Sequence, residues 1–196
     1  MNYLAHAFVS KDDPLLNLGN ILGDWVKGNR LEVYSLPVQQ GISLHRSIDR
    51  FTDSHAIIQE LKLFFRPHAH LGAGVFVDIF LDYALAHSPE YLSESQHRKL
   101  SNSVYALLDS HRDYMNDRMQ SYFGHMKSYD WLFNYRFESG IYNTVVGLSK
   151  RYPRLGNGAW AFDIWLKLKD RFQDDFSLFF PQLMAHCEKH MQGFRE

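Results

Sequence analysis

The chain has 196 residues, a length typical of one domain, and its 45% hydrophobic and 15% aromatic content excludes an intrinsically disordered protein. Its 21 Lys and Arg nearly balance its 22 Asp and Glu, so the net charge of −1 gives no electrostatic reason to expect binding to nucleic acid or to an anionic membrane. The single cysteine, Cys187, excludes an internal disulfide and a multi-thiolate zinc site, and any bound metal must therefore be held mainly by oxygen and nitrogen.

Helical periodicity runs through the sequence, whereas alternating strand patterns bounded by Asn-Gly or Asp-Gly turns are missing. Short loops and the lack of a linker or repeat predict an all-α fold, a single compact helical domain over residues 1–196. The sequence shows no export signal and no apolar run of about 18 residues, which predicts a cytoplasmic protein. In chain order, helices are expected at residues 4–9, 14–28, 37–51, 54–66, 72–87, 94–117, 127–150 and 159–191, the last with a candidate break at Pro181.

Three of these helices begin with a recognisable N-terminal signal. Asp13 directly precedes a proline and can cap the helix that follows. Ser35 is the cap candidate before Pro37, which would then occupy the second helical position. Ser93 and Gln96 have the spacing of a capping box.

The first two helices each carry one ionisable residue among apolar neighbours. His6 lies in the run YLAHAF, and Asp24 lies in GNILGDWV. A lone histidine on an apolar helix is more often a hydrogen-bonded core residue than a ligand. His6 and Asp24 therefore indicate a functional site only when they are considered together with the ionisable residues further along the chain.

The segment GISLHRSIDRFTD at 41–53 places His45 and Asp49 four residues apart on one helix face. A carboxylate one turn from a histidine is a common way to orient the imidazole. Asp49 is therefore expected either to orient a metal-bound His45 or to be a ligand itself. The alternative is an ordinary His–Asp pair on the surface.

The segment GAGVFVDIFLDYALA at 72–86 is apolar on nearly every side and predicts a buried central helix interrupted by Asp78 and Asp82. Their spacing puts both carboxylates on one face, where two like charges are costly unless a proton, an ion pair or a cation meets them. A metal and a structural partner, either an Arg or helix-terminal N–H groups, remain equal alternatives for these two residues.

Taken together, the acids and histidines of four helical segments predict a metal centre. Mixed His and Asp ligation suits Mn²⁺, with Mg²⁺ or Fe²⁺ as alternatives, and such ions activate water and neutralise phosphoryl oxygens. The competing interpretation is a metal-free helical interaction or cofactor-binding module whose buried acids are paired with arginines.

Several ordered blocks of the sequence resemble the acyl carrier protein phosphodiesterases, also called ACP hydrolases. The blocks are MNYLAHAF at 1–8, GNILGDWVKGN at 19–29, GISLHRSIDRFTDSH at 41–55, VDIFLDYALA at 77–86, WLFNYR at 131–136 and SKRYPRL at 149–155. The resemblance implies an HD-domain-like, metal-dependent phosphohydrolase of lipid metabolism that favours manganese. Its implied reaction hydrolyses the phosphodiester between 4′-phosphopantetheine and a serine of holo-acyl carrier protein, giving the apo-protein.

The resemblance also implies roles for residues of this chain. It places His6, Asp24, His45 and Asp78 at the metal, and Asp49 and Asp82 would orient these ligands or be further ligands. In the implied hydrolysis a carboxylate such as Asp49 or Asp82 could take the proton of the water, and Arg46 could hold the phosphate. The adjacent His-Asp dipeptide of the wider HD pattern is missing, since Gly23 precedes Asp24. A nucleotide or another small phosphodiester is the alternative substrate, because a fold does not fix its substrate.

Basic residues cluster in sequence around the expected ligand helices, although the whole chain is nearly neutral. An acidic carrier protein would be steered by such cations toward the metal, and the alternative is that they are ordinary solvated helix ends. The positions are Lys27, Arg30, Arg46, Arg50 and Arg66.

Overall fold

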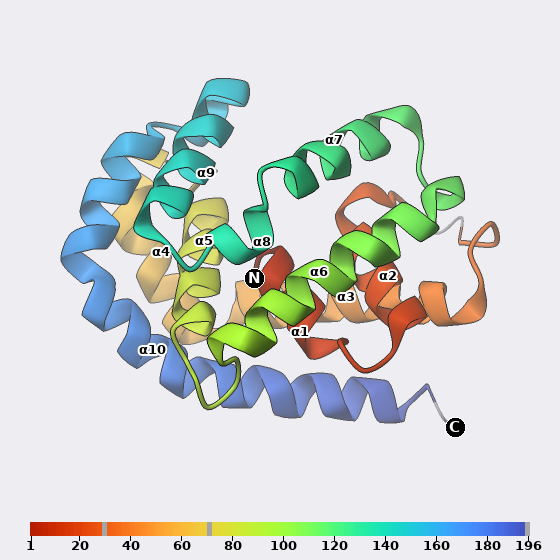
Figure 1. Ribbon diagram of the computed structural model, residues 1–196. Helices are drawn as coiled ribbons and strands as arrows, with labels where there is room; N and C mark the ends of the chain where they lie inside the picture. The colour runs from red at the N-terminus through yellow and green to blue at the C-terminus, as the bar shows by residue number, and fades with distance from the viewer. Residues whose placement is uncertain (29–30, 70–71, 195–196) are drawn as a thin grey trace.

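The computed structural model describes residues 1–28, 31–69 and 72–194, and in these ranges the chain forms α-helices and short 3₁₀ segments without a β-strand (Figure 1). The predicted all-α class is confirmed. The elements are α1 (Tyr3–Val9), α2 (Pro14–Leu22), η1 (Gly23–Trp25), α3 (Leu36–Ser54), α4 (Ala56–Ala69), α5 (Gly72–Ala86), α6 (Glu94–Ser110), η2 (Arg112–Tyr114), α7 (Asp117–Ser128), α8 (Trp131–Asn134), α9 (Glu138–Arg151), η3 (Pro153–Leu155) and α10 (Gly158–Gln192).

The predicted starts of the three helices α2, α3 and α6 are confirmed, and two of them have the expected side-chain cap. The Asp13 carboxylate accepts from two backbone N–H groups in the first turn of α2. Ser35 occupies the N-cap position of α3, with Pro37 at the second helical position, but the Ser35 side chain accepts no capping hydrogen bond, so this cap is wrong. Ser93 and Gln96 form a reciprocal capping box at the start of α6.

The predicted helices at 94–117 and 127–150 are wrong in their boundaries, and α7 was not expected. Helix α6 ends at Ser110, and the Asn116 side chain then caps a separate helix by accepting from the Met119 N–H. Asp130 has a φ of 46°, a left-handed conformation that separates α7 from α8. Apolar periodicity does not detect these interruptions, because it continues across a short turn that capping side chains stabilise.

Helix α10 continues through Pro181, so the candidate break there is wrong. The proline removes one backbone donor, but Phe179, Phe180 and Leu183 around it are fully buried. Their burial outweighs the missing hydrogen bond. Figure 1 shows the helix curving along the left side and base of the molecule, and it contacts α3, α4, α5 and α9.

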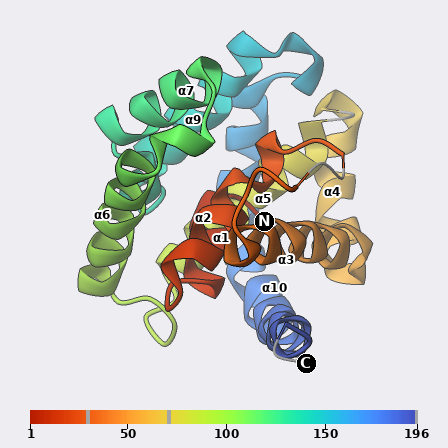
Figure 2. The same ribbon diagram turned by 90° about the vertical axis from the view of Figure 1, so that its right-hand side faces the viewer.

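The hydrophobic core surrounds α1 and α5. Every residue of α1 is buried, as are most residues of α5. Phe80 of α5 stacks on Trp165 of α10 with ring centroids 5.0 Å apart. Figure 2 shows α10 nearly end-on beneath α3, with α6, α7 and α9 on the opposite side of the central helices. No helix in the described ranges is long and apolar enough to cross a bilayer.

Helices α2 and α3 approach each other closely at two facing glycines. A Cβ on Gly19 would lie 2.0 Å from the Val38 carbonyl oxygen, and a Cβ on Gly41 would lie 2.1 Å from the Leu16 carbonyl oxygen. Only glycine allows this distance between the two backbones. The contact matters for function because α3 carries His45 and Asp49, while α2 leads directly into η1 with Asp24.

Gly41→Ala should therefore destabilise the protein by about 1–3 kcal/mol, because the added methyl group meets backbone that cannot rotate away. Urea denaturation measures the change. Gly124→Ala in α7 is the matched control, since its Cβ would meet nothing within 4 Å. The control should gain about 0.5–1 kcal/mol from lower chain entropy. Equal stability of the two variants would refute the tight α2–α3 contact.

Candidate metal centre

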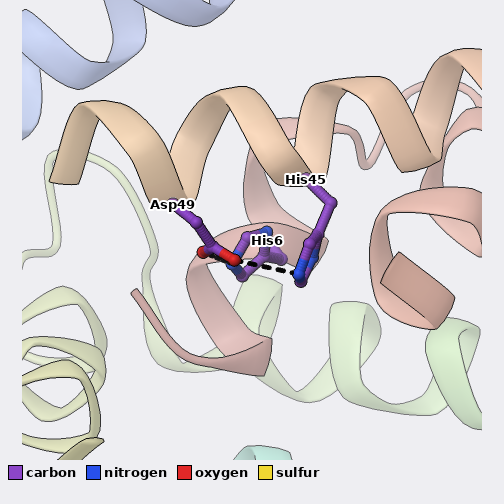
Figure 3. A group of neighbouring side chains, drawn as sticks. All are labelled: His6, His45 and Asp49. Atoms are coloured by element: carbon purple, nitrogen blue, oxygen red, sulfur yellow. Dashed lines mark ion pairs between the residues drawn. The ribbon is translucent and has the colours of Figure 1, made fainter. Parts of the chain in front are cut away.

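Three of the predicted side chains converge between α1 and α3. His6, His45 and Asp49 offer ligand atoms that all lie within 4.8 Å of one another. Figure 3 shows His45 and Asp49 leaving the same side of α3, with the His6 ring between them. The two oxygens of Asp49 divide between the histidines, with Oδ1 3.2 Å from His6 Nε2 and Oδ2 3.1 Å from His45 Nε2.

Asp24 joins this group from η1. Its Oδ1 lies 3.3 Å from His45 Nε2, and its side chain is 57% exposed, against 41% for Asp49. The four residues His6, Asp24, His45 and Asp49 form what we call the metal-centre cluster. Asp24 is its most solvent-accessible acid, so it borders the path by which water or a substrate would approach.

Asn20 fixes both imidazole rings. Its side-chain NH₂ donates to the His6 carbonyl oxygen and to Ser10 Oγ, so its Oδ1 accepts from His6 Nδ1 at 2.8 Å. Its backbone carbonyl accepts from His45 Nδ1, also at 2.8 Å. Since each Nδ1 carries a proton, the neutral form of each ring has its lone pair on Nε2, the atom that faces the carboxylates.

The rings also stack on each other, with centroids 4.2 Å apart and planes inclined by 24°. Gly23 makes room for His45, because a Cβ there would lie 2.2 Å from the His45 Cγ. The Gly-Asp dipeptide thus has two functions. The glycine admits the imidazole, and the next residue supplies a carboxylate to it.

Protonation in the cluster is asymmetric. Burial alone would lower the pKa of His45, but the hydrogen bonds and charges of Asp24 and Asp49 raise it to about 9. Burial and the charge of His45 lower the pKa of His6 despite the opposing effect of Asp49. Burial would raise the pKa of Asp49, but both histidines hold it well below its usual range.

The cluster fits a divalent cation. His6 Nε2 is buried without a hydrogen-bond partner, although a carboxylate oxygen lies 3.2 Å away. A bare nitrogen lone pair beside a carboxylate is repulsive, and a cation between them removes the repulsion. Two imidazole nitrogens and two carboxylates match the ligand types of Mn²⁺, Fe²⁺ and Zn²⁺, and the outer hydrogen bonds from Asn20 are those expected around metal-bound histidines.

Asp82 lies apart from the metal-centre cluster and caps α1. It is fully buried, and its oxygens accept from the backbone N–H groups of Leu4 at 2.8 Å and Ala5 at 3.3 Å. These are two of the N-terminal donors that α1 cannot satisfy itself. Of the partners considered from the sequence, helix-terminal N–H groups are therefore the ones that the structure shows for Asp82. The catalytic role of Asp82 stays a prediction, and its contacts are those of a structural residue.

Asp78 lies one turn before Asp82 and pairs with the amino group of Met1. The Oδ1–nitrogen distance is 3.0 Å, and the Asp78 side chain is 27% exposed. The structure therefore brings Asp49, rather than Asp78, together with the histidines. The role of Asp78 as a metal ligand stays a prediction. The alternative interpretation pairs the buried acids with arginines. Within the described ranges no arginine forms an ion pair with any of the four acids, Asp24, Asp49, Asp78 and Asp82.

Arg46 follows His45 in α3 and holds the chain after η1. Its Nη2 donates to the carbonyl oxygens of Val26 at 3.1 Å and Gly28 at 2.6 Å. Of the other predicted basic positions, Arg50 and Lys27 are exposed, and Arg66 donates to the Gln59 side chain. Arg30 lies outside the described residues.

Two participants were not predicted from the sequence. Asn20 orients both histidines, and the only sequence signal for it is a polar residue inside an apolar helix, four residues before Asp24. The Met1 amino group meets Asp78 across a separation of 77 residues. No local pattern in the sequence indicates a contact at that separation.

Comparison with known proteins places these residues in a family context. The family model described as Acyl carrier protein phosphodiesterase matches residues 1–183. Three proteins named acyl carrier protein phosphodiesterase are similar in sequence to this chain. The identity to this chain is 31% for the protein from Enterobacter sp. (strain 638), 28% for that from Serratia proteamaculans (strain 568) and 30% for that from Escherichia coli (strain K12 / DH10B). Each alignment covers 96% of this chain and 98% of the relative. No solved structure matches the chain at a significant level.

The pH dependence of stability tests the environment of Asp82. Burial raises its pKa to about 7 despite the N–H groups of Leu4 and Ala5, compared with about 3.9 in an unfolded chain. The folded state therefore binds the extra proton, and the contribution of Asp82 to the free energy of unfolding falls as pH rises from about 4 to about 7.

Asp82→Asn removes this titration. Relative to the variant, the wild-type protein should lose a few kcal/mol between about pH 4 and about pH 7. Urea denaturation of both proteins in chelator measures the difference. If the difference in unfolding free energy between the two proteins stays constant over this pH range, Asp82 is ionised in the folded protein at every pH tested, and the prediction is wrong.

Proposed function

The chain belongs to the acyl carrier protein phosphodiesterase family, and we propose that it hydrolyses the phosphodiester between 4′-phosphopantetheine and a serine of holo-acyl carrier protein. The observation that carries this proposal is the similarity over nearly the whole chain, which includes every residue of the metal-centre cluster. The products are apo-acyl carrier protein and free 4′-phosphopantetheine. A cytoplasmic location and a relation to HD-type phosphohydrolases stay predictions.

We further propose that the reaction depends on a divalent metal, with Mn²⁺ as the first choice. His6 Nε2, His45 Nε2 and the carboxylates of Asp49 and Asp24 would hold it. The support is the unpartnered, buried Nε2 of His6 and the two rings whose protonated Nδ1 atoms both point away from the cluster. When bound, such an ion activates water and neutralises charge on phosphoryl oxygens.

The residues of the chain then have distinct tasks in an attack of water on phosphorus. Asp24 is the most exposed carboxylate, and only its Oδ1 faces His45, so its Oδ2 is assigned to accept the proton that the water loses. Among the described contacts of Arg46 only Nη2 is used, so we assign Nε and Nη1 to a phosphoryl oxygen. The bond from phosphorus to the serine Oγ breaks, and the oxygen leaves with a proton as the serine hydroxyl.

Mass spectrometry of the carrier protein tests the reaction directly. Holo-acyl carrier protein incubated with the Mn²⁺-loaded enzyme should lose the mass of one phosphopantetheine and become the apo-protein. Asp24→Asn should slow this conversion by at least about 10²-fold, the typical loss when a proton acceptor is removed. An unchanged holo mass, together with cleavage of a nucleotide phosphodiester, would move the assignment to the alternative substrate.

Metal binding has a readout that does not depend on turnover. Mn²⁺ should raise the melting temperature of the chelator-treated protein, because a ligand at about 100 times its Kd stabilises the folded state by about 2.7 kcal/mol. Chelator should abolish turnover, and Mn²⁺ should restore it.

His6→Ala and Asp49→Asn should lose this thermal shift. His87→Ala serves as the control, because His87 is exposed and lies outside the metal-centre cluster. Full turnover after dialysis against excess chelator would contradict the metal mechanism.

A further inference from the structure

Two neighbouring cavities lie beside the metal-centre cluster. The larger, about 440 Å³, extends between α7, α8 and α9, and the smaller, about 380 Å³, lies between η1, α7 and the end of α9. Tyr122, His125 and Arg151 line both of them. Each volume falls within the range of about 300–1,000 Å³ typical of small-molecule sites.

The smaller cavity begins next to the cluster. Trp25 lines it and directly follows Asp24 in η1. The Trp25 ring packs edge-on against Tyr122 at a centroid distance of 5.0 Å, and Tyr122 in turn contacts Trp131 at 5.5 Å. A continuous row of aromatic side chains therefore leads from Asp24 into the larger cavity. The helices that line this cavity, α7, α8 and α9, lie in the upper part of the molecule in Figure 1.

The walls combine apolar surfaces with uncharged polar groups. Trp131, Tyr129 and Leu148 supply apolar area, whereas Asn143 and Thr144 supply amide and hydroxyl groups. Among the residues that line the two cavities there is no aspartate or glutamate. The arginines in the lining are Arg118, in the smaller cavity that Trp25 also lines, and Arg151, in both cavities. An elongated, mostly uncharged molecule with an anionic end near η1 fits this distribution.

We infer that the two joined cavities, called the arm channel below, bind the pantetheine arm of the carrier protein while the phosphodiester lies at the metal-centre cluster. The inference rests on the proposed function. The arm is a flexible chain with a dimethyl group and two amides and has no charge beyond its phosphate, so it matches aromatic walls with amide and hydroxyl partners. Binding energy from this remote part of the substrate positions the reacting phosphorus.

Gly147 allows the arm channel to be filled without disturbing the fold. It lies on α9 in the lining of the larger cavity, and a Cβ there would meet nothing within 4 Å. Gly147→Leu should therefore occupy part of the cavity. Gly124→Leu is a matched control, since Gly124 is also an exposed helical glycine with open space around it and lines neither cavity.

Two measurements test the inference. Isothermal titration with free 4′-phosphopantetheine should show at least tenfold weaker binding to Gly147→Leu than to the wild-type protein. Steady-state kinetics with holo-acyl carrier protein should show a KM raised at least tenfold, with a smaller change in kcat. Gly147→Ala should give intermediate values, and Gly124→Leu should match the wild type. The Mn²⁺ thermal shift of Gly147→Leu should be retained, which separates a blocked channel from a damaged metal centre.

Wild-type KM and wild-type phosphopantetheine binding in Gly147→Leu would overturn the inference. A raised KM with unchanged phosphopantetheine binding would also overturn it, because the cavity would then contact the carrier polypeptide instead of the arm. Failure of the proposed function gives a different result, since the wild-type enzyme would then leave the carrier in its holo form. Phosphopantetheine binding that Gly147→Leu abolishes would support the arm channel even in that case.

Discussion

Asn20 is the residue on which the arrangement of the metal-centre cluster depends. One side chain and one carbonyl group accept the Nδ1 protons of two histidines from different helices. Both Nε2 atoms therefore point toward Asp49, and the Nε2 of His45 also faces Asp24. The hydrogen bonds are buried and therefore costly to break. Two rigidly held nitrogens and two acids are donor groups that suit a divalent cation, and the proposed ion would compensate for the negative charge of the acids.

The buried Asp82 of α5 supports this site from a distance. It accepts hydrogen bonds from two N-terminal donors of α1, Leu4 and Ala5, and His6 is the next residue of that helix. The carboxylate therefore sets the position of a helix whose seven residues offer no side-chain cap of their own. A carboxylate in an apolar environment can be stabilised either by a metal ion or by the N–H groups at a helix N-terminus. For Asp82 the fold supplies the N-terminus of α1.

The parts of the fold that were hardest to predict from the sequence are the ones that border the arm channel. Helix α7, the left-handed Asp130 and the short α8 interrupt the apolar pattern and hold Tyr122, Tyr129 and Trp131 around one cavity. Regular amphipathic helices bury their apolar stripe and close the space between them. A sharp turn between short helices leaves space open, and such a departure from regular patterning is expected at functional sites.

The sequence alone determined the helical class, most helix starts and the candidate residues, because helical periodicity, capping pairs and the i to i+4 spacing of His45 and Asp49 are local properties. Tertiary structure alone decided which acids share the histidines. Asp24 and Asp49 join them because glycines let α2, η1 and α3 approach closely, whereas Asp78 and Asp82 meet the start of the chain instead. Partners that lie 77 and 78 residues apart are set by helix packing, and no short-range pattern encodes that packing.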